Sequence, residues 1–235
     1  IATSHRYAKR IGKTPIIVND APGFYVNRIL GPYMNEAAIL LQEGVAIEKI
    51  DEAMLDWGFP VGPITLYDEV GLDVAAKSGA ILADAFGDRM QPNQILAAMT
   101  SDDRLGRKNG RGFYTYADGK REGPDDTVYA LFGQPARKDM PAAEIQDRLA
   151  LGMLSEAVRC LEDGVLRSAR DGDVGAVLGI GFPPFRGGPF WHIDQVGAAE
   201  IVTRLRALES AHGPRFTPAP LLVEKSESAD VFGDS

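Results

Sequence analysis

GFPVGPITLYDEVG at residues 58–71 and GFPPFRGGPFWHIDQVG at residues 181–197 decide the fold of this chain, because they are two versions of one pattern. Each has a Gly-Phe-Pro stop, a Gly-Pro pair, an aspartate six residues after the glycine of that pair, and a Val-Gly pair that ends nine residues after it. Upstream of each version, at Glu36 and at Glu156, the glutamate of a Glu-Ala pair stands eight residues before a glycine. Chance rarely repeats residue types and offsets together, so the chain contains two copies of one helical module. Two copies are too few for a solenoid, which favours a duplicated domain.

The spacing of apolar residues predicts a mainly α fold. In the first copy, Asp20 followed by Pro22 predicts the start of a long helix, since aspartate caps the first N–H groups and proline has none to satisfy. Further helices are expected at residues 47–57, 63–70 and 82–99, and in the second copy from residue 142 and over residues 198–211. The tail after Ser226 is polar, and we expect it to be frayed.

Composition excludes several classes of function. The chain has 235 residues, of which 45% are hydrophobic and 25% are charged, as in ordinary globular proteins. Its net charge of -8 disfavours non-specific binding to nucleic acid, and no apolar run is long enough to predict a membrane span. The single cysteine, Cys160, cannot form an internal disulfide, which fits a reducing compartment, and we expect a cytoplasmic protein.

The opening of the chain predicts an incomplete structure. Residues 4–13 read as the end of a basic amphipathic helix, and residues 14–18 (TPIIV) read as a short apolar strand. No partner strand is evident nearby, and an isolated strand is not stable. We therefore expect the chain to begin inside a larger protein, just before the last strand of a sheet.

The residues by themselves do not supply a complete catalytic set. The sequence has no dinucleotide-binding fingerprint, no phosphate loop and no Cys/His spacing typical of zinc, so no metal site is predicted. Asn27 stands in the first turns of a helix, where an amide can hold a substrate carbonyl, or can simply be satisfied by its neighbours. Lys108 stands in the glycine loop GRKNGRG, where it can reach an anionic cofactor, or can belong to a solvated turn.

Several of these stretches together resemble a known family. KTPIIVNDAPGFYVNRIL, GFPVGPITLYDEVGLD and GRKNGRGFYTY resemble the C-terminal region of 3-hydroxyacyl-CoA dehydrogenases. SEAVRCLEDGV and GIGFPPFRGGPFWHID resemble the duplicated helical domain of the multifunctional alpha subunits of bacterial fatty-acid oxidation complexes. The resemblance covers about residues 5–225, and the tandem copy favours the multifunctional subunits over the short enzymes.

The resemblance implies an oxidoreductase of fatty-acid beta-oxidation (lipid degradation), which converts an L-3-hydroxyacyl-CoA to a 3-ketoacyl-CoA with NAD. The family's catalytic histidine and its carboxylate partner lie in the dinucleotide domain, so no catalytic residue is expected in this chain, which we predict to be inactive alone. By the PGFYVNR match, Asn27 takes the place of a substrate-binding asparagine; by the GRKNG match, Lys108 takes a cofactor-binding position. Some multifunctional members carry a substrate-binding aromatic residue before the GIGFPPF stretch, where this chain has Leu178, so that role is not carried over.

The resemblance also implies a domain plan. Residues 1–20 would end a truncated Rossmann domain, residues 21–117 and 142–235 would be the two helical domains, and residues 118–141 would link them. The expected partners are acyl-CoA and either a second copy of the chain or a thiolase subunit, with no nucleic acid. The alternative is a non-catalytic helical module for dimerisation or thiolase docking. A third hypothesis is that the chain is the C-terminal domain of another two-domain dehydrogenase, but the two motifs PGFYVNR and GRKNGRGFY disfavour it.

Overall fold

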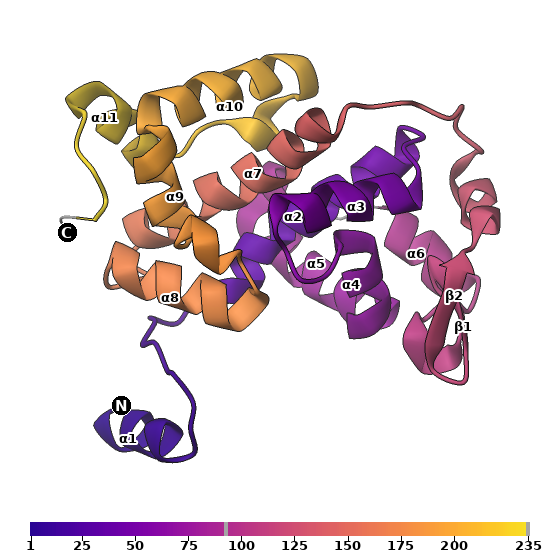
Figure 1. The fold of residues 1–235 in the computed structure, drawn as a ribbon, viewed down its shortest axis with the longest axis horizontal. Coiled ribbons are helices and arrows are strands. Elements are labelled where there is room, and N and C mark those ends of the chain that lie inside the picture. Colours follow the sequence, from indigo (N-terminus) through magenta and orange to yellow (C-terminus); the bar gives the residue numbers. More distant parts are fainter. Residues whose placement is uncertain (92–93, 234–235) are drawn as a thin grey trace. The chain divides into compact units, whose positions relative to one another are not determined.

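The chain folds into two compact units, and the computed structural model describes residues 1–91 and 94–233. Unit 1 combines Ile1–Leu30 with Leu151–Ser235, and unit 2 is Gly31–Ala150. Both divisions fall inside long helices, α2 (Val26–Gln42) and α7 (Ala142–Glu162), and the first falls just before Gly31 and Pro32, which α2 contains (Figure 1). The predicted mainly α fold is confirmed, while the domain boundaries after residues 20, 117 and 141 stay predictions.

Unit 2 contains most elements of the first copy. Besides its parts of α2 and α7, these are α3 (Ile47–Trp57), α4 (Pro63–Val70), α5 (Leu72–Phe86), α6 (Gln94–Ser101), the antiparallel strands β1 (Tyr114–Ala117) and β2 (Lys120–Pro124), and the 3₁₀ turns η1 (Gly87–Met90), η2 (Arg107–Asn109) and η3 (Asp126–Phe132). Its core includes the stacked rings of Trp57 and Phe59 and the buried side chains of Leu41 and Met54. Helix α4 contacts α3, α5 and η2, so the glycine loop lies against it.

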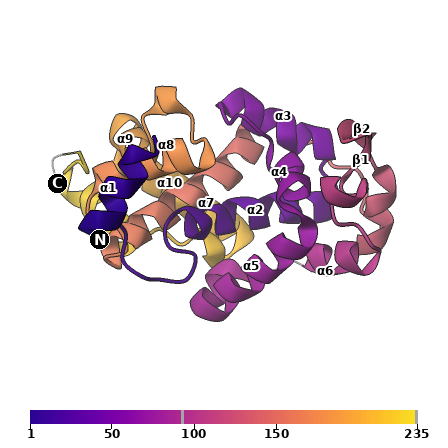
Figure 2. The ribbon, with the colours of Figure 1, turned by 90° about the horizontal axis from the view of Figure 1, so that it is seen from below.

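Unit 1 contains α1 (Ala2–Arg10), the start of α2, the end of α7 and the rest of the second copy. That copy continues with α8 (Ala169–Ile180), η4 (Pro184–Arg186), α9 (Pro189–Val196), α10 (Ala198–His212), η5 (Pro214–Phe216) and α11 (Pro220–Ser228). Consecutive helices from α8 to α11 contact one another (Figures 1 and 2). Among the residues that the structure describes, no helix has the length and hydropathy needed to cross a bilayer.

Two helix predictions for the first copy are wrong. Helix α2 starts at Val26 and not after Asp20, because Gly23 and Phe24 have φ angles of 72° and 50°, which an α-helix excludes. The helix predicted over residues 82–99 is instead the end of α5, the turn η1 and α6, because Gly87 adopts a φ of 59° and ends α5; residues 92–93 lie outside the described part.

Two predictions for the ends of the chain are also wrong. Residues 14–18 have no regular secondary structure, because no described strand pairs with them, although Asn19 N–H donates to Val165 O at 2.9 Å. The tail is not frayed after Ser226: α11 continues to Ser228, and Phe232 beyond it is buried with 1% exposure.

The duplication extends to the hydrogen bonds that start α4 and α9. In unit 2, Asp51 of α3 accepts the N–H of Ile64 at 2.7 Å, at the start of α4. In unit 1, Asp173 of α8 accepts the N–H of Phe190 at 2.8 Å, at the start of α9. A side chain at Gly62 or Gly188 would collide with the corresponding aspartate. The Gly-Pro pairs of the sequence pattern therefore leave room for a carboxylate that caps the next helix.

A repeated buried ion pair joins the long helices. In unit 1, Arg28 donates to Glu156 and to Asp163, each at 2.6 Å. In unit 2, Arg148 donates to Glu36 at 2.6 Å and to Glu43 at 2.7 and 2.8 Å. Each arginine stands eight residues before a repeated glutamate, and each pairs with the glutamate of the other copy. In each unit, the start of one long helix thus binds the later part of the other.

The Arg148 cluster predicts acid sensitivity. Burial alone would raise the pKa of Glu43, but the hydrogen bonds and charges of Arg148 and Lys138 outweigh it and lower the pKa to about 2. A lowered carboxylate pKa adds stability above its unfolded value of 4.5, and that stability is lost as pH falls toward 2. The free energy of unfolding of both chains should fall between pH 6 and pH 2.5, and we expect the fall to be about 2 kcal/mol smaller for Glu43→Gln than for the unchanged chain. Urea unfolding at each pH measures it. Parallel pH profiles for the two chains would contradict this.

Candidate functional site

Asn27 lies at the second position of α2 in unit 1 and is exposed to solvent. The preceding residues form a tight turn in which the N–H of Phe24 donates to Ala21 O at 2.8 Å. Phe24 holds a left-handed conformation that is unfavourable for a residue with a Cβ, and its side chain is 52% exposed. The turn therefore presents an aromatic ring and, three residues later, an amide at the start of one helix.

Contacts on both sides of this turn hold it in place. The Arg28 guanidinium follows Asn27 directly and is fixed by its pairs with Glu156 and Asp163. Before the turn, the Asn19 side chain donates to Gly164 O at 2.7 Å. Contacts before and after Asn27 therefore fix the backbone that carries its exposed side chain.

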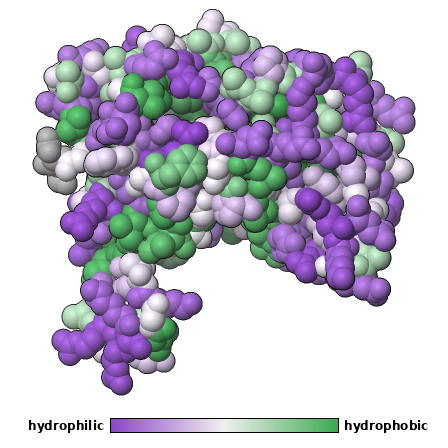
Figure 3. Space-filling model, in the orientation of Figure 1, coloured by the Kyte–Doolittle hydropathy of each residue, from purple (hydrophilic) through white to green (hydrophobic). Residues whose placement is uncertain are grey.

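Helix α8 packs against the same turn. A Cβ at Gly175 would lie 2.5 Å from Ile16 and 3.3 Å from the ring of Tyr25, and one at Gly179 would lie 2.9 Å from Val26. These glycines allow the close approach of α8. The neighbouring Leu178 is 62% exposed, and Figure 3 shows apolar surface over α8 and the segment between α1 and α2. The second copy thus packs against Val26, the residue before Asn27, and carries apolar surface on the same helix.

Lys108 lies in unit 2, in the 3₁₀ turn η2, and its ammonium group pairs with Asp73 in the first turn of α5. That hydrogen bond lowers the pKa of Asp73. Both side chains are more than a third exposed, so the pair contributes little to stability. Lys108 is therefore an accessible cation that can exchange its carboxylate for another anion at small cost.

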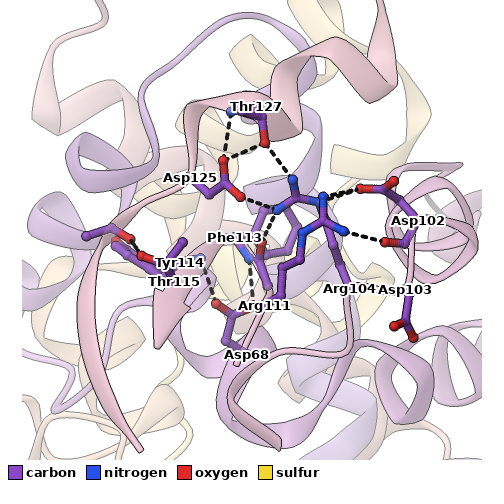
Figure 4. A network of polar contacts seen from close by, with 12 residues as sticks. Asp68, Asp102, Asp103, Arg104, Arg111, Phe113, Tyr114, Thr115, Asp125 and Thr127 are labelled. Atoms are coloured by element: carbon purple, nitrogen blue, oxygen red, sulfur yellow. Dashed lines mark hydrogen bonds and ion pairs between the residues drawn. The ribbon is translucent and has the colours of Figure 1, made fainter. Parts of the chain in front are cut away.

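Arg104 anchors the loop that carries Lys108. Its side chain is 1% exposed and donates to Asp102 at 2.9 Å, to Asp125 at 2.6 Å, to Thr127 at 2.6 Å and to Gly112 O at 2.9 Å. Figure 4 shows the guanidinium between Asp102 on one side and Asp125 and Thr127 on the other. One buried side chain thereby joins the start of the loop, its last glycine and η3.

Asp68 anchors the other end of the loop. Its carboxylate accepts the N–H of Phe113 at 3.0 Å, the N–H of Tyr114 at 2.9 Å and the hydroxyl of Tyr116 at 3.2 Å. Burial raises the pKa of Asp68 to about 6, although these hydrogen bonds oppose the rise. A side chain at Gly106 or Gly112 would collide with Asp68. The glycines of the loop thus serve close packing against α4.

The two predicted site residues belong to different units, Asn27 to unit 1 and Lys108 to unit 2, and each is described in its own unit. Sequence reasoning missed the buried residues that hold them, Arg28, Arg104 and Asp68. Arg28 could have been found from the sequence, because Arg28 precedes Glu36 by the same eight residues by which Arg148 precedes Glu156. Asp68 could have been found because the second copy repeats it as Asp194. Within residues 1–91 and 94–233, no group of three or more histidine, cysteine or acidic side chains is placed to hold a metal ion.

Comparison with known proteins gives concordant matches. Residues 23–116 match the model of the 3-hydroxyacyl-CoA dehydrogenase C-terminal domain. The chain is 50% identical over 234 residues to the fatty acid oxidation complex subunit alpha of Shewanella amazonensis, which is 99% of this chain and 33% of that protein. A second such subunit, from another Shewanella, is 52% identical over 227 residues, 94% of this chain and 32% of that protein. The chain thus spans about a third of these curated relatives.

Solved structures agree in fold. A 3-hydroxybutyryl-CoA dehydrogenase from Escherichia coli K12 superposes with a TM-score of 0.79 at 25% identity, over 97% of this chain and 64% of that one. The dehydrogenase part of multifunctional enzyme 1 from C. elegans superposes with a TM-score of 0.70 at 26% identity, over 95% of this chain and 52% of that one. Both matches include the second copy as well as the first.

Proposed function

We propose that this chain, whose residues 23–116 belong to the 3-hydroxyacyl-CoA dehydrogenase C-terminal domain family, is the substrate-side part of an NAD-dependent L-3-hydroxyacyl-CoA dehydrogenase of fatty-acid beta-oxidation. The observation that carries the proposal is the identity of 50% over 99% of the chain to a fatty acid oxidation complex subunit alpha. The reaction is oxidation of the 3-hydroxyacyl thioester to the 3-ketoacyl thioester, in the cytoplasm. This chain contributes binding and positioning, and the acid–base groups belong to a dinucleotide domain.

In this proposal Asn27 binds the acyl thioester carbonyl. Its exposure, its place at the start of α2 and the backbone anchored by Asn19 and Arg28 support that role. An amide N–H donor aimed at a carbonyl stabilises the charge that develops on the oxygen. The apolar surface of α8, which packs on Val26 next to Asn27 in the chain, suits an acyl chain.

NAD accepts the hydride when it is bound, and Lys108 is the residue of this chain proposed to lie near it. The exposed pair of Lys108 with Asp73 fits such a role, because the ammonium can turn to a phosphate. One lysine without a glycine fingerprint is not a dinucleotide site, so the main part of that site is assigned to another domain.

The proposal is tested by NADH formation from a 3-hydroxyacyl-CoA. We expect no turnover by residues 1–235 alone, and turnover when the same chain is extended upstream by a full dinucleotide-binding domain of a relative. Absorbance at the NADH band measures both. Turnover by the short chain would overturn the assignment of this chain to the substrate side, and no turnover by a folded extended chain would overturn the proposed activity.

A second function, assembly by self-association or docking to a thiolase subunit, is favoured by the exposed aromatic side chains of unit 1. Phe185 is 75% exposed and Trp191 is 53% exposed. Large apolar side chains on a surface are typical of protein interfaces. Sedimentation of Phe185→Ser beside the unchanged chain tests this: a shift to a smaller species supports assembly through this surface, and equal sedimentation argues against it.

A further inference from the structure

Residues 229–233, which we call the strap, follow α11 and are bound by an aspartate of another helix. The strap leaves α11 through Ala229, which has a left-handed φ of 59°. It then places two successive N–H groups against Asp194 of α9, with Phe232 N–H at 2.9 Å and Gly233 N–H at 2.9 Å from carboxylate oxygens. The side chain of Phe232 is 1% exposed. The carboxylate and the buried ring together fix both the backbone and the side chain of this segment.

Two further side chains complete the site. The Phe232 ring packs edge-on against Phe190 with ring centres 5.3 Å apart. The ammonium of Lys225 lies 5.7 Å from the centre of the Phe232 ring and donates to Val231 O at 3.3 Å. An anion that accepts two amides, an aromatic wall and a cation that binds a carbonyl are the elements of a peptide-binding site.

The first copy uses the corresponding aspartate in the same way. Asp68 accepts the N–H groups of Phe113 and Tyr114, and the Phe113 ring packs on Tyr67 with centres 5.9 Å apart. There the bound segment continues into β1, whose pairing with β2 adds ladder hydrogen bonds. In the described residues the strap pairs with no strand, so it is held through the side chains of Asp194, Lys225 and Phe190.

We propose that Asp194, Lys225 and Phe190 form a binding site for a short peptide segment containing a phenylalanine, and that the strap is its built-in, detachable ligand. The expected partner is a peptide in which the N–H of a phenylalanine and the N–H of the following residue donate to Asp194. A tethered ligand has an effective concentration in the millimolar range, so a dissociation constant about tenfold lower, about 0.1 mM, keeps the strap bound for most of the time. The same segment supplied as a free peptide should therefore bind once the tethered phenylalanine is removed, and should compete with the strap in the unchanged chain. This site is independent of the proposed dehydrogenase function.

The test compares Phe232→Ala with the unchanged chain, each titrated with the pentapeptide of residues 229–233. We expect the variant to show saturable shifts in the amide NMR signals of α9 with a dissociation constant of about 0.1 mM. The unchanged chain should respond at least about tenfold more weakly, because its site is occupied. A pentapeptide with alanine in place of phenylalanine, and the double variant Phe232→Ala with Asp194→Ala, should show no saturable shift. No response by the folded single variant, or equal responses by variant and unchanged chain, overturns the proposal.

Hydrogen exchange of the unchanged chain keeps the proposal testable if Phe232→Ala does not fold. A detachable strap exposes the Phe232 and Gly233 amides without unfolding of α7, so they should exchange at least about 100-fold faster than the core amides of that helix. Ala229→Gly favours the left-handed hinge and should slow this exchange severalfold. Exchange of the strap amides only together with α7 overturns the proposal.

Discussion

Replacing Arg104 by alanine is expected to lower the free energy of unfolding by about 3 kcal/mol, because the substitution removes a buried side chain and leaves the buried Gly112 O and the partly buried Asp125 without their donor. Asp125, Thr127 and Gly112 O all accept from this side chain, which is 1% exposed (Figure 4). Gly112 is buried, and a buried acceptor left without a donor costs about 1–3 kcal/mol. Urea unfolding followed by circular dichroism measures the loss, and a change below about 1 kcal/mol would show that the network contributes no more than a surface pair.

Arg111 offers a matched control in the same loop. It pairs with the same residue, Asp102, at 3.0 Å, but its side chain is 47% exposed. Exposed pairs contribute about 0–1 kcal/mol, so Arg111→Ala should cost far less than Arg104→Ala. Equal losses for the two variants would indicate that the charge of the loop, and not burial, determines its stability.

Replacing Asn27 by alanine is expected to lower the turnover number about 100-fold in the chain extended by a dinucleotide domain, since removing one donor to a developing oxyanion typically has an effect of that size. Stability should change little, because Asn27 is exposed and alanine favours helices. NADH formation measures the turnover, and thermal unfolding of the same sample shows that the variant is folded.

Asn35→Ala is the matched control for this prediction. It makes the same change on the same helix, two turns further along, and should leave turnover within about twofold of the unchanged protein. If Asn27→Ala also keeps full turnover and full assembly, the substrate role of Asn27 is wrong, and assembly remains as the function that the surface of unit 1 supports.

Local sequence patterns predicted a helix correctly where the apolar spacing and the residues that end the helix lie within one short stretch. The helices at 47–57 and 63–70 match α3 and α4, since each has apolar residues at helical spacing and ends at a glycine. Helix α8 was not predicted, because Gly172, Gly175 and Gly179 lower its intrinsic helix propensity. The Ser168 side chain that caps it, accepting from Asp171 N–H, was the local signal for its start.

The turn before Asn27 shows the limit of such patterns at the candidate site. Asp20 and Pro22 form a valid helix-start signal, yet the chain makes a left-handed turn at Gly23 and Phe24 first. Tyr25 is buried by that turn against α8, which is more than a hundred residues further along the chain. Packing with a distant element therefore outweighed a local preference that contributes only about 1 kcal/mol.

The sequence by itself determined the duplication, the mainly α fold and the match of residues 23–116 to a family model, because each depends on residue types at short offsets. Only the tertiary structure decided that Arg28 pairs with Glu156, that Asp68 holds the glycine loop and that Asp194 binds the strap. These partners are 128, 45 and 38 residues apart along the chain. Burying a charged group or a backbone amide costs free energy unless it forms a hydrogen bond or an ion pair. The local spacing of residues does not predict which distant segment supplies that partner.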